Sequence, residues 1–214
     1  TCVMITTSDF DMMIDCGEGS YLRWQRAGYQ WKHLKYILIT HMHPDHTGGL
    51  LPFLFYRKLY SIESPLTIIG PPNLEAYLTD SFQHTGISHN QDLHFISIAD
   101  HSEMEHKISC WGYALKDGRR KLVFITDTRR NTNSIKLANK ADVLIHEATF
   151  QHHQRDKALE HFHVTEIQAM EIADAAQVKR LILTHFSPRL TDENIKEWTW
   201  QGQTCTVFDE RQNI

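Results

Sequence analysis

The stretch ITHMHPDHTGG, residues 39–49, places four side chains that can bind a metal ion within six positions: His41, His43, Asp45 and His46. Imidazoles titrate at about pH 6.5 and repel one another when charged, so crowding three of them gains little unless a cation organises them. Mixed imidazole and carboxylate ligands suit Zn²⁺, with Mn²⁺ or Fe²⁺ as competitors. One histidine beside a strand usually belongs to the core or the surface. Four potential ligands on one loop indicate a metal site.

The composition is that of an ordinary globular protein. The 214 residues suit one domain, which we expect to span residues 1–214. The net charge of −4 gives the whole chain no strong field that would attract nucleic acid, although a local basic patch remains compatible with it. The four scattered cysteines form no C-x-x-C pair, so we expect reduced thiols and a cytoplasmic location. No signal peptide and no long apolar run is visible, so we expect no membrane association.

Hydrophobic patterns predict an α/β chain in which the candidate ligands follow strands. Strands are predicted on either side of a turn at Ser8 and Asp9, and over residues 34–40, 65–72, 93–99, 107–115, 121–127, 142–149, 179–185 and 205–208. Helices are predicted over residues 20–29, 48–60, 73–86, 133–141 and 164–177. The mixture indicates a layered α/β sandwich with metal-binding loops at strand ends.

Local signals sharpen some of these boundaries. Asn73 is a plausible N-cap and Gly86 a helix stop, while Asp117-Gly118 is typical of a hairpin turn. Thr165 and Gln168 form a capping-box pattern. The helix that follows carries one apolar face, made by Ala169, Ile172, Ala173 and Ala176.

The motif H-x-H-x-D-H after an apolar strand resembles the signature of the metallo-β-lactamase superfamily. The order of four further segments is similar to that of ribonuclease Z, the metal-dependent endonuclease that trims the 3′ end of precursor tRNA. These segments are DCGEG (15–19), HEATF (146–150), HVT (163–165) and LTHFSPR (183–189). The resemblance implies a four-layer αββα sandwich with the metal site at strand-end loops.

The resemblance also implies two bound metal ions, both Zn²⁺ by preference. One would be held by His41, His43 and His106, and the other by Asp45, His46 and His185, with Asp127 as the bridge. Independently of the resemblance, His106, Asp127 and His185 lie at or beside the ends of predicted strands, where ligands can converge.

The implied mechanism is hydrolysis of a phosphodiester by metal-activated water. Asp45 would orient that water or act as base. His163 would protonate the leaving oxygen while Glu147 holds its imidazole, although His161 competes for the same role. Arg129 and Arg130 follow Asp127 closely and suit either phosphate contacts or a solvated loop.

Departures from the family pattern leave the substrate open. Many ribonuclease Z proteins carry a tRNA-gripping arm after the Gly-Tyr pair that corresponds to Gly112-Tyr113, but only 13 residues (114–126) precede Asp127 here, and one hairpin uses them up. The family's first strand and its Gly-Thr loop do not precede Thr1, so we expect an N-terminal strand to be missing. HVT also replaces the usual His-Ser-Thr.

Three functions therefore compete. The first is cleavage of precursor tRNA, by a protein that the resemblance implies is a homodimer. The second is hydrolysis of small phosphodiesters such as cyclic nucleotides, or of sulfate esters, by an armless relative. The third is a metal-binding scaffold without catalysis, against which the intact set of seven ligand candidates argues. β-Lactamase and glyoxalase II activities are weaker alternatives, because neither predicts HEATF.

Overall fold

In the computed structural model, the chain divides into two units, residues 1–100 and 101–213. The structure describes residues 1–87, 93–97, 103–191, 195, 198–201, 203–204 and 206–207. Each unit is built on one five-stranded sheet with helices packed against it.

The sheet of the first unit has the order β1-β2-β3-β4-β5. An antiparallel pair, β1 and β2, begins it, and the remaining neighbours are parallel. The strands are β1 Val3–Thr6, β2 Asp11–Ile14, β3 Leu34–Leu38, β4 Leu66–Gly70 and β5 Leu93–Ser97. The helices are α1 Ser20–Arg26, α2 Pro44–Thr47, α3 Leu50–Leu59 and α4 Leu74–Thr85.

The core of this unit lies between one sheet face and the helices α1, α3 and α4. Met13, Ile37 and Ile68 come from adjacent strands, and Phe53 and Leu78 meet them from α3 and α4; all five are fully buried. The parallel strands β2, β3 and β4 therefore run in one direction under the helices, and their carboxyl ends share one edge of the sheet.

The sheet of the second unit has the order β14-β11-β10-β9-β8. The β8–β9 pair is an antiparallel hairpin, and the other neighbours are parallel. Its strands are β8 Tyr113–Asp117, β9 Arg120–Ile125, β10 Val143–Glu147, β11 Leu181–Thr184 and β14 Thr206–Val207. Two small pairs accompany it: β6 Glu103–Met104 with β7 Cys110–Trp111, and β12 Thr199–Trp200 with β13 Gln203–Thr204.

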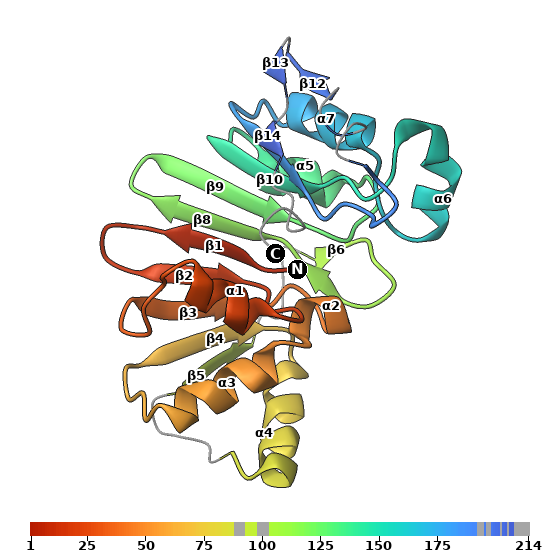
Figure 1. Ribbon diagram of the computed structural model, residues 1–214. Coiled ribbons are helices and arrows are strands. Elements are labelled where there is room, and N and C mark those ends of the chain that lie inside the picture. Colours follow the sequence, from red (N-terminus) through yellow and green to blue (C-terminus); the bar gives the residue numbers. More distant parts are fainter. Residues whose placement is uncertain are drawn as a thin grey trace. The chain divides into compact units, whose positions relative to one another are not determined.

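The helical elements of the second unit are α5 Thr132–Ala138, the 3₁₀ turn η1 His152–Gln154, α6 Arg155–Glu160 and α7 Glu166–Ala175. Helices α5 and α7 pack on the sheet (Figure 1). The predicted apolar face of α7 is confirmed, since Ala169, Ile172, Ala173 and Ala176 are all fully buried in this core. The predicted capping box is confirmed too: Thr165 accepts from the backbone N–H of Gln168, whose side chain accepts from that of Thr165.

Some predictions fail locally. The single strand predicted over residues 107–115 is wrong, because the chain is irregular before Cys110 and is interrupted at Gly112 between β7 and β8. A Cβ atom at Gly112 would lie 2.7 Å from Leu137 Cδ2, so the chain packs there without a side chain. Asn73 does stand at the N-cap of α4, but its side chain makes no capping hydrogen bond. Residues 205 and 208 of the last predicted strand lie outside the described residues.

The two units do not decide whether residues 1–214 form the single domain expected from the sequence, so that domain stays a prediction. None of the helices in the described part of the chain combines the length and apolar character that crossing a bilayer requires.

The cap of α7 offers a test of this architecture. Replacing Thr165 with alanine removes the acceptor for the Gln168 N–H, and we expect the free energy of unfolding to fall by about 1 kcal/mol. Urea denaturation would measure the change. Thr132→Ala, at an exposed position in the first turn of α5, is the control and should change stability by no more than about 0.5 kcal/mol. Equal effects of the two substitutions would contradict the capping role.

Candidate active site

The histidine-rich loop of the first unit begins where β3 ends. Ile14 of β2 pairs with Leu38 of β3, so the residues that follow both strands emerge at the same edge of the sheet. The backbone N–H of Asp15 donates to the Leu38 carbonyl at 2.7 Å and extends this pairing. The register of two parallel strands therefore brings Asp15 next to Thr40 and the histidines that follow it.

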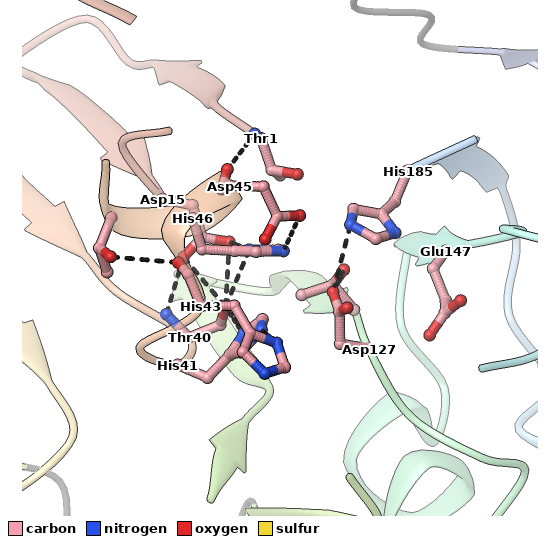
Figure 2. Close-up of polar contacts among 12 residues, drawn as sticks. Thr1, Asp15, Thr40, His41, His43, Asp45, His46, Asp127, Glu147 and His185 are labelled. Carbon is pink, nitrogen blue, oxygen red and sulfur yellow. Dashed lines mark hydrogen bonds and ion pairs between the residues drawn. The ribbon is translucent and has the colours of Figure 1, made fainter. Parts of the chain in front are cut away.

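Asp15 is the hydrogen-bonding centre of this loop (Figure 2). Its carboxylate accepts from the Thr40 backbone N–H at 2.8 Å and from the Thr40 hydroxyl at 3.0 Å. It also lies 2.7 Å from His46 Nδ1, and both side chains are fully buried. Because an ionised carboxylate only accepts, Nδ1 of His46 carries the proton and Nε2 is left as a ligand atom. That Nε2 lies 3.2 Å from Asp45 Oδ2, so the two atoms are close enough to bind one ion.

His41 is oriented through Thr40. The Thr40 hydroxyl donates to Asp15, so it can accept from His41 Nδ1, which lies 3.0 Å away. This arrangement leaves Nε2 of His41 as the ligand atom, and it lies 2.9 Å from Nδ1 of His43. Two imidazole nitrogens that approach so closely fit a shared cation. The candidate ligands of this unit therefore suit a metal ion such as Zn²⁺, both in the type of their donor atoms and in the imidazole tautomers that their neighbours favour.

Glycines allow the backbone to close around the loop. A Cβ atom at Gly17 would lie 2.1 Å from the carbonyl oxygen of Asp45, and one at Gly49 would lie 2.0 Å from that of Gly17. Neither position has room for a side chain. Gly17 and Gly49 thus let two strand-end loops touch through their backbones.

In the second unit, too, the register of parallel strands brings the candidate residues to one edge of the sheet. Strands β9, β10 and β11 are parallel neighbours, with His146 opposite Ile125 and Glu147 opposite Thr184. Asp127 and His185 follow β9 and β11 within two residues of these pairs. The carboxyl ends of three adjacent strands therefore gather the predicted Asp127, Glu147 and His185 at one edge.

Glu147 is fully buried and its carboxylate is surrounded by donors. It accepts from the Thr128 backbone N–H at 2.7 Å and from the Thr149 hydroxyl at 2.6 Å, and it lies 3.0 Å from His163 Nδ1. Burial alone would raise the pKa of Glu147, but the nearby His163, by its charge and its hydrogen bond, lowers that pKa below its usual value. An ionised Glu147 fixes the proton of His163 on Nδ1 and directs Nε2 away from the carboxylate.

Thr149 connects this pair to His185. Its hydroxyl donates to Glu147, so it can accept from His185 Nδ1 at 3.0 Å. Nε2 of His185 then faces Asp127 Oδ2 at 3.5 Å, as Figure 2 shows. Ligand atoms of Asp127, His163 and His185 all lie within 4.8 Å of one another. The Nδ1 atom of His163 is bound by Glu147, which favours a proton-transfer role over a ligand role for this residue.

Three residues of the site have a left-handed backbone. Asp15, Asp127 and His185 have φ angles of 59°, 46° and 56°, and each directly or closely follows a strand. Non-glycine residues rarely adopt this conformation, and they concentrate at functional sites where the surroundings hold them in place. These three unusual conformations therefore favour a functional role for the strand ends at which they lie.

The structure also places the remaining candidates named from the sequence, namely His106, His161, Arg129 and Arg130. The ring of His106 lies 5.9 Å from that of His163. His161 is exposed and stacks on Phe150, so His163 is the histidine that Glu147 holds. Arg129 and Arg130 are both engaged by protein groups: Arg129 donates to the Leu159 carbonyl, and Arg130 pairs with Glu171 at 3.2 Å.

The sequence interpretation assigned no role to Asp15 or Thr149, although the structure places both in contact with candidate ligands. A signal existed for each. Asp15 is an acid at a strand end directly before Cys16-Gly17, and Thr149 lies two positions after Glu147 within HEATF.

Comparisons with known proteins agree with this geometry. A family model described as "Beta-lactamase superfamily domain" matches residues 11–186. Ribonuclease Z of Picosynechococcus sp. is 30% identical over an alignment that covers 85% of this chain and 77% of that protein. Ribonuclease BN of Proteus mirabilis is 29% identical, with 94% and 86% of the two chains covered. The crystal structure of the short form of human tRNase Z superposes with a TM-score of 0.78 at 26% identity, covering 88% of this chain and 86% of that one.

The predicted α/β metallo-β-lactamase fold is confirmed by this match and by the superposition. The alignment with ribonuclease BN spans 263 positions, which exceeds the 214 residues of this chain, so that relative has internal residues with no counterpart here. This difference agrees with a chain that lacks the arm.

We expect Asp15→Asn to weaken metal binding by about 10-fold to 100-fold, because the amide cannot accept from Thr40 and orient His46 as the carboxylate does. Titration of zinc into the metal-free proteins, in competition with a chromophoric zinc chelator, would measure the dissociation constant of zinc from each. Asp9→Asn, at an exposed turn, is the matched control and should bind as the wild type does. Unchanged affinity in Asp15→Asn would show that Asp15 does not orient the ligands.

Proposed function

The chain belongs to the metallo-β-lactamase superfamily, in the branch related to ribonucleases Z and BN, and from this premise we propose that it cleaves phosphodiester bonds of RNA at the 3′ end of precursor tRNA. As a member of this branch it is a metal-dependent hydrolase. The observation that carries the finer proposal is the pairing of the buried Glu147 with the partly buried His163, beside Asp127 and His185.

The proposed ligands are the seven residues that the sequence predicts. His41, His43 and His106 would hold one ion, Asp45, His46 and His185 the other, and Asp127 would bridge them. Three histidines support this set: His41, His46 and His185. In each of them Nδ1 is directed at a buried acceptor, which leaves Nε2 as the ligand atom. When bound, two Zn²⁺ ions would supply an activated water and stabilise charge on the phosphate oxygens.

The protein's own groups would handle the protons. Asp45 has a side chain that is 60% exposed and close to His46, so it can orient the attacking water and accept its proton. His163 would deliver a proton from Nε2 to the leaving nucleoside oxygen. Glu147 holds Nδ1 of His163 and stabilises the imidazolium, as a buried carboxylate does in catalytic triads.

A second candidate, hydrolysis of small phosphodiesters such as cyclic nucleotides or of sulfate esters, is favoured by one observation. Tyr113 begins β8, Ile125 ends β9, and the hairpin between them leaves no room for an arm before Asp127. Tight binding of tRNA depends on many phosphate contacts, and the net charge of −4 offers no general attraction. The homodimer, the identity of the metal and the cytoplasmic location stay predictions.

Cleavage of a 3′-extended precursor tRNA by the zinc-loaded protein would test the proposal, with bis-p-nitrophenyl phosphate assayed in parallel. We expect cutting after the discriminator nucleotide, and a loss of about 100-fold or more in His163→Ala because the leaving oxygen then lacks its acid. His153→Ala, at an exposed position, should retain full activity.

The two substrates separate the candidates. Turnover of the small diester alone would favour the second candidate over tRNA processing. Turnover of neither substrate with metal bound would contradict the enzyme and support a binding scaffold.

A further inference from the structure

Arg129 lies in the loop between β9 and α5, two residues after Asp127, and it makes contacts that a phosphate-binding arginine would not need. Its Nε donates to the Leu159 carbonyl at 2.7 Å, and its Cζ lies 3.7 Å from the centre of the Phe162 ring. Its backbone N–H donates to the Glu105 carbonyl at 3.0 Å, and its Nη1 lies 3.4 Å from a Glu105 carboxylate oxygen. The guanidinium is thus directed at the segment made by the last turn of α6 and the residues just after it.

That segment ends helix α6 in a Schellman motif. The backbone N–H of His163 donates to the Ala158 carbonyl at 2.8 Å, and that of Phe162 to the Leu159 carbonyl at 3.4 Å. Phe162 occupies the left-handed position of the motif with a φ of 62°. Glycine usually fills this position because a side chain is disfavoured there, so Phe162 needs support from its surroundings.

Arg129 provides that support at two points. Its charged Nε–H binds a carbonyl at the C-terminal end of α6, where a cation also favours the helix dipole. Its planar guanidinium lies over the Phe162 ring in a cation–π contact. The two contacts fix Leu159 and Phe162, which lie four positions and one position before His163.

The same loop also holds the partner of His163. The backbone N–H of Thr128 donates to Glu147 at 2.7 Å, so neighbouring residues of one loop fix both members of the pair. From this geometry we propose that Arg129 is a positioning residue that holds the α6 terminus so that His163 meets Glu147. The expected effect on kcat rests on the proposed function, whereas the expected effect on the position of His163 does not.

The experiment compares Arg129→Met with Arg130→Met in the zinc-loaded protein. Methionine keeps much of the length and apolar volume of arginine but removes the charge and the donors. Arg130 is the matched control because it is the adjacent arginine, its side chain is 45% exposed, and it pairs at the surface with Glu171. Phe162→Leu, which removes the ring from the same motif, is a second variant that leaves Arg129 in place.

The first readout is hydrogen exchange of the His163 amide, measured by NMR, which needs no catalysis. We expect exchange to be about tenfold faster or more in Arg129→Met and in Phe162→Leu, because the motif opens more often, and unchanged in Arg130→Met. The amides of Val123 and Ile145 in the sheet core should exchange as in the wild type, which shows that the unit stays folded.

The second readout is dependence on the leaving group. A dinucleoside diester with an alkoxide leaving group should lose about 10-fold to 100-fold in kcat in Arg129→Met, whereas bis-p-nitrophenyl phosphate, whose leaving group needs no proton, should change by only about twofold. Arg129→Lys should restore part of the loss, since it keeps the charge but cannot both stack and donate as a guanidinium does.

Unchanged His163 exchange in Arg129→Met would overturn the proposal. An equal loss on both diesters with unchanged exchange would also overturn it, because Arg129 would then act on the phosphate. If the wild-type protein hydrolyses neither diester, the proposed function fails, and the exchange measurement alone decides whether Arg129 positions His163.

Discussion

Buried acceptors that fix the tautomers of the imidazoles are the constraint on which the candidate site depends. A histidine can serve as a ligand through Nε2 only if its other nitrogen keeps the proton. Asp15 meets this requirement for His46 directly and for His41 through Thr40. In the second unit, Thr149 does the same for His185 while it donates to Glu147. In each unit a strand-end residue outside the predicted ligand set therefore determines what the histidines can do.

Holding carboxylates in buried positions has an energetic cost that the two sheets must offset. Asp15 and Glu147 are fully buried, and an unpaired buried charge is strongly destabilising. Each is surrounded by donors, several of them backbone N–H groups that the sheet edges fix in place. The left-handed backbone at Asp127 and His185 adds further strain. Rigid parallel strands with apolar cores make such an arrangement possible, and the loops alone would not maintain it.

Much of this could be predicted from the sequence because the strongest signals are local. H-x-H-x-D-H marks four candidate ligands, and apolar strands before Asp127, Glu147 and His185 place these residues at strand ends. The role of Asp15 depends on the β2–β3 register, which no local pattern contains. Helix α6 was not predicted, since its six residues, RDKALE, are mostly charged and lack a clear apolar period. The choice for Arg129 between phosphate and protein depended on Leu159, which lies 30 positions away along the chain.

Under the proposed function, the catalytic residues and the residues that would bind a large RNA are separate parts of the chain. Glu147 and several of the proposed ligand residues, Asp127 and His185 among them, lie at or just after the ends of strands, so the sheets set their geometry. An RNA-binding arm would be an insertion between Tyr113 and Asp127, where this chain has only a hairpin. An interaction that stabilises the bound substrate and the transition state equally affects substrate affinity, so its loss raises KM. An interaction made only in the transition state affects the chemical rate, so its loss lowers kcat. A chain with this site and no arm should therefore retain its rate on any diester that reaches the site, and should differ from armed relatives chiefly in KM for a large RNA.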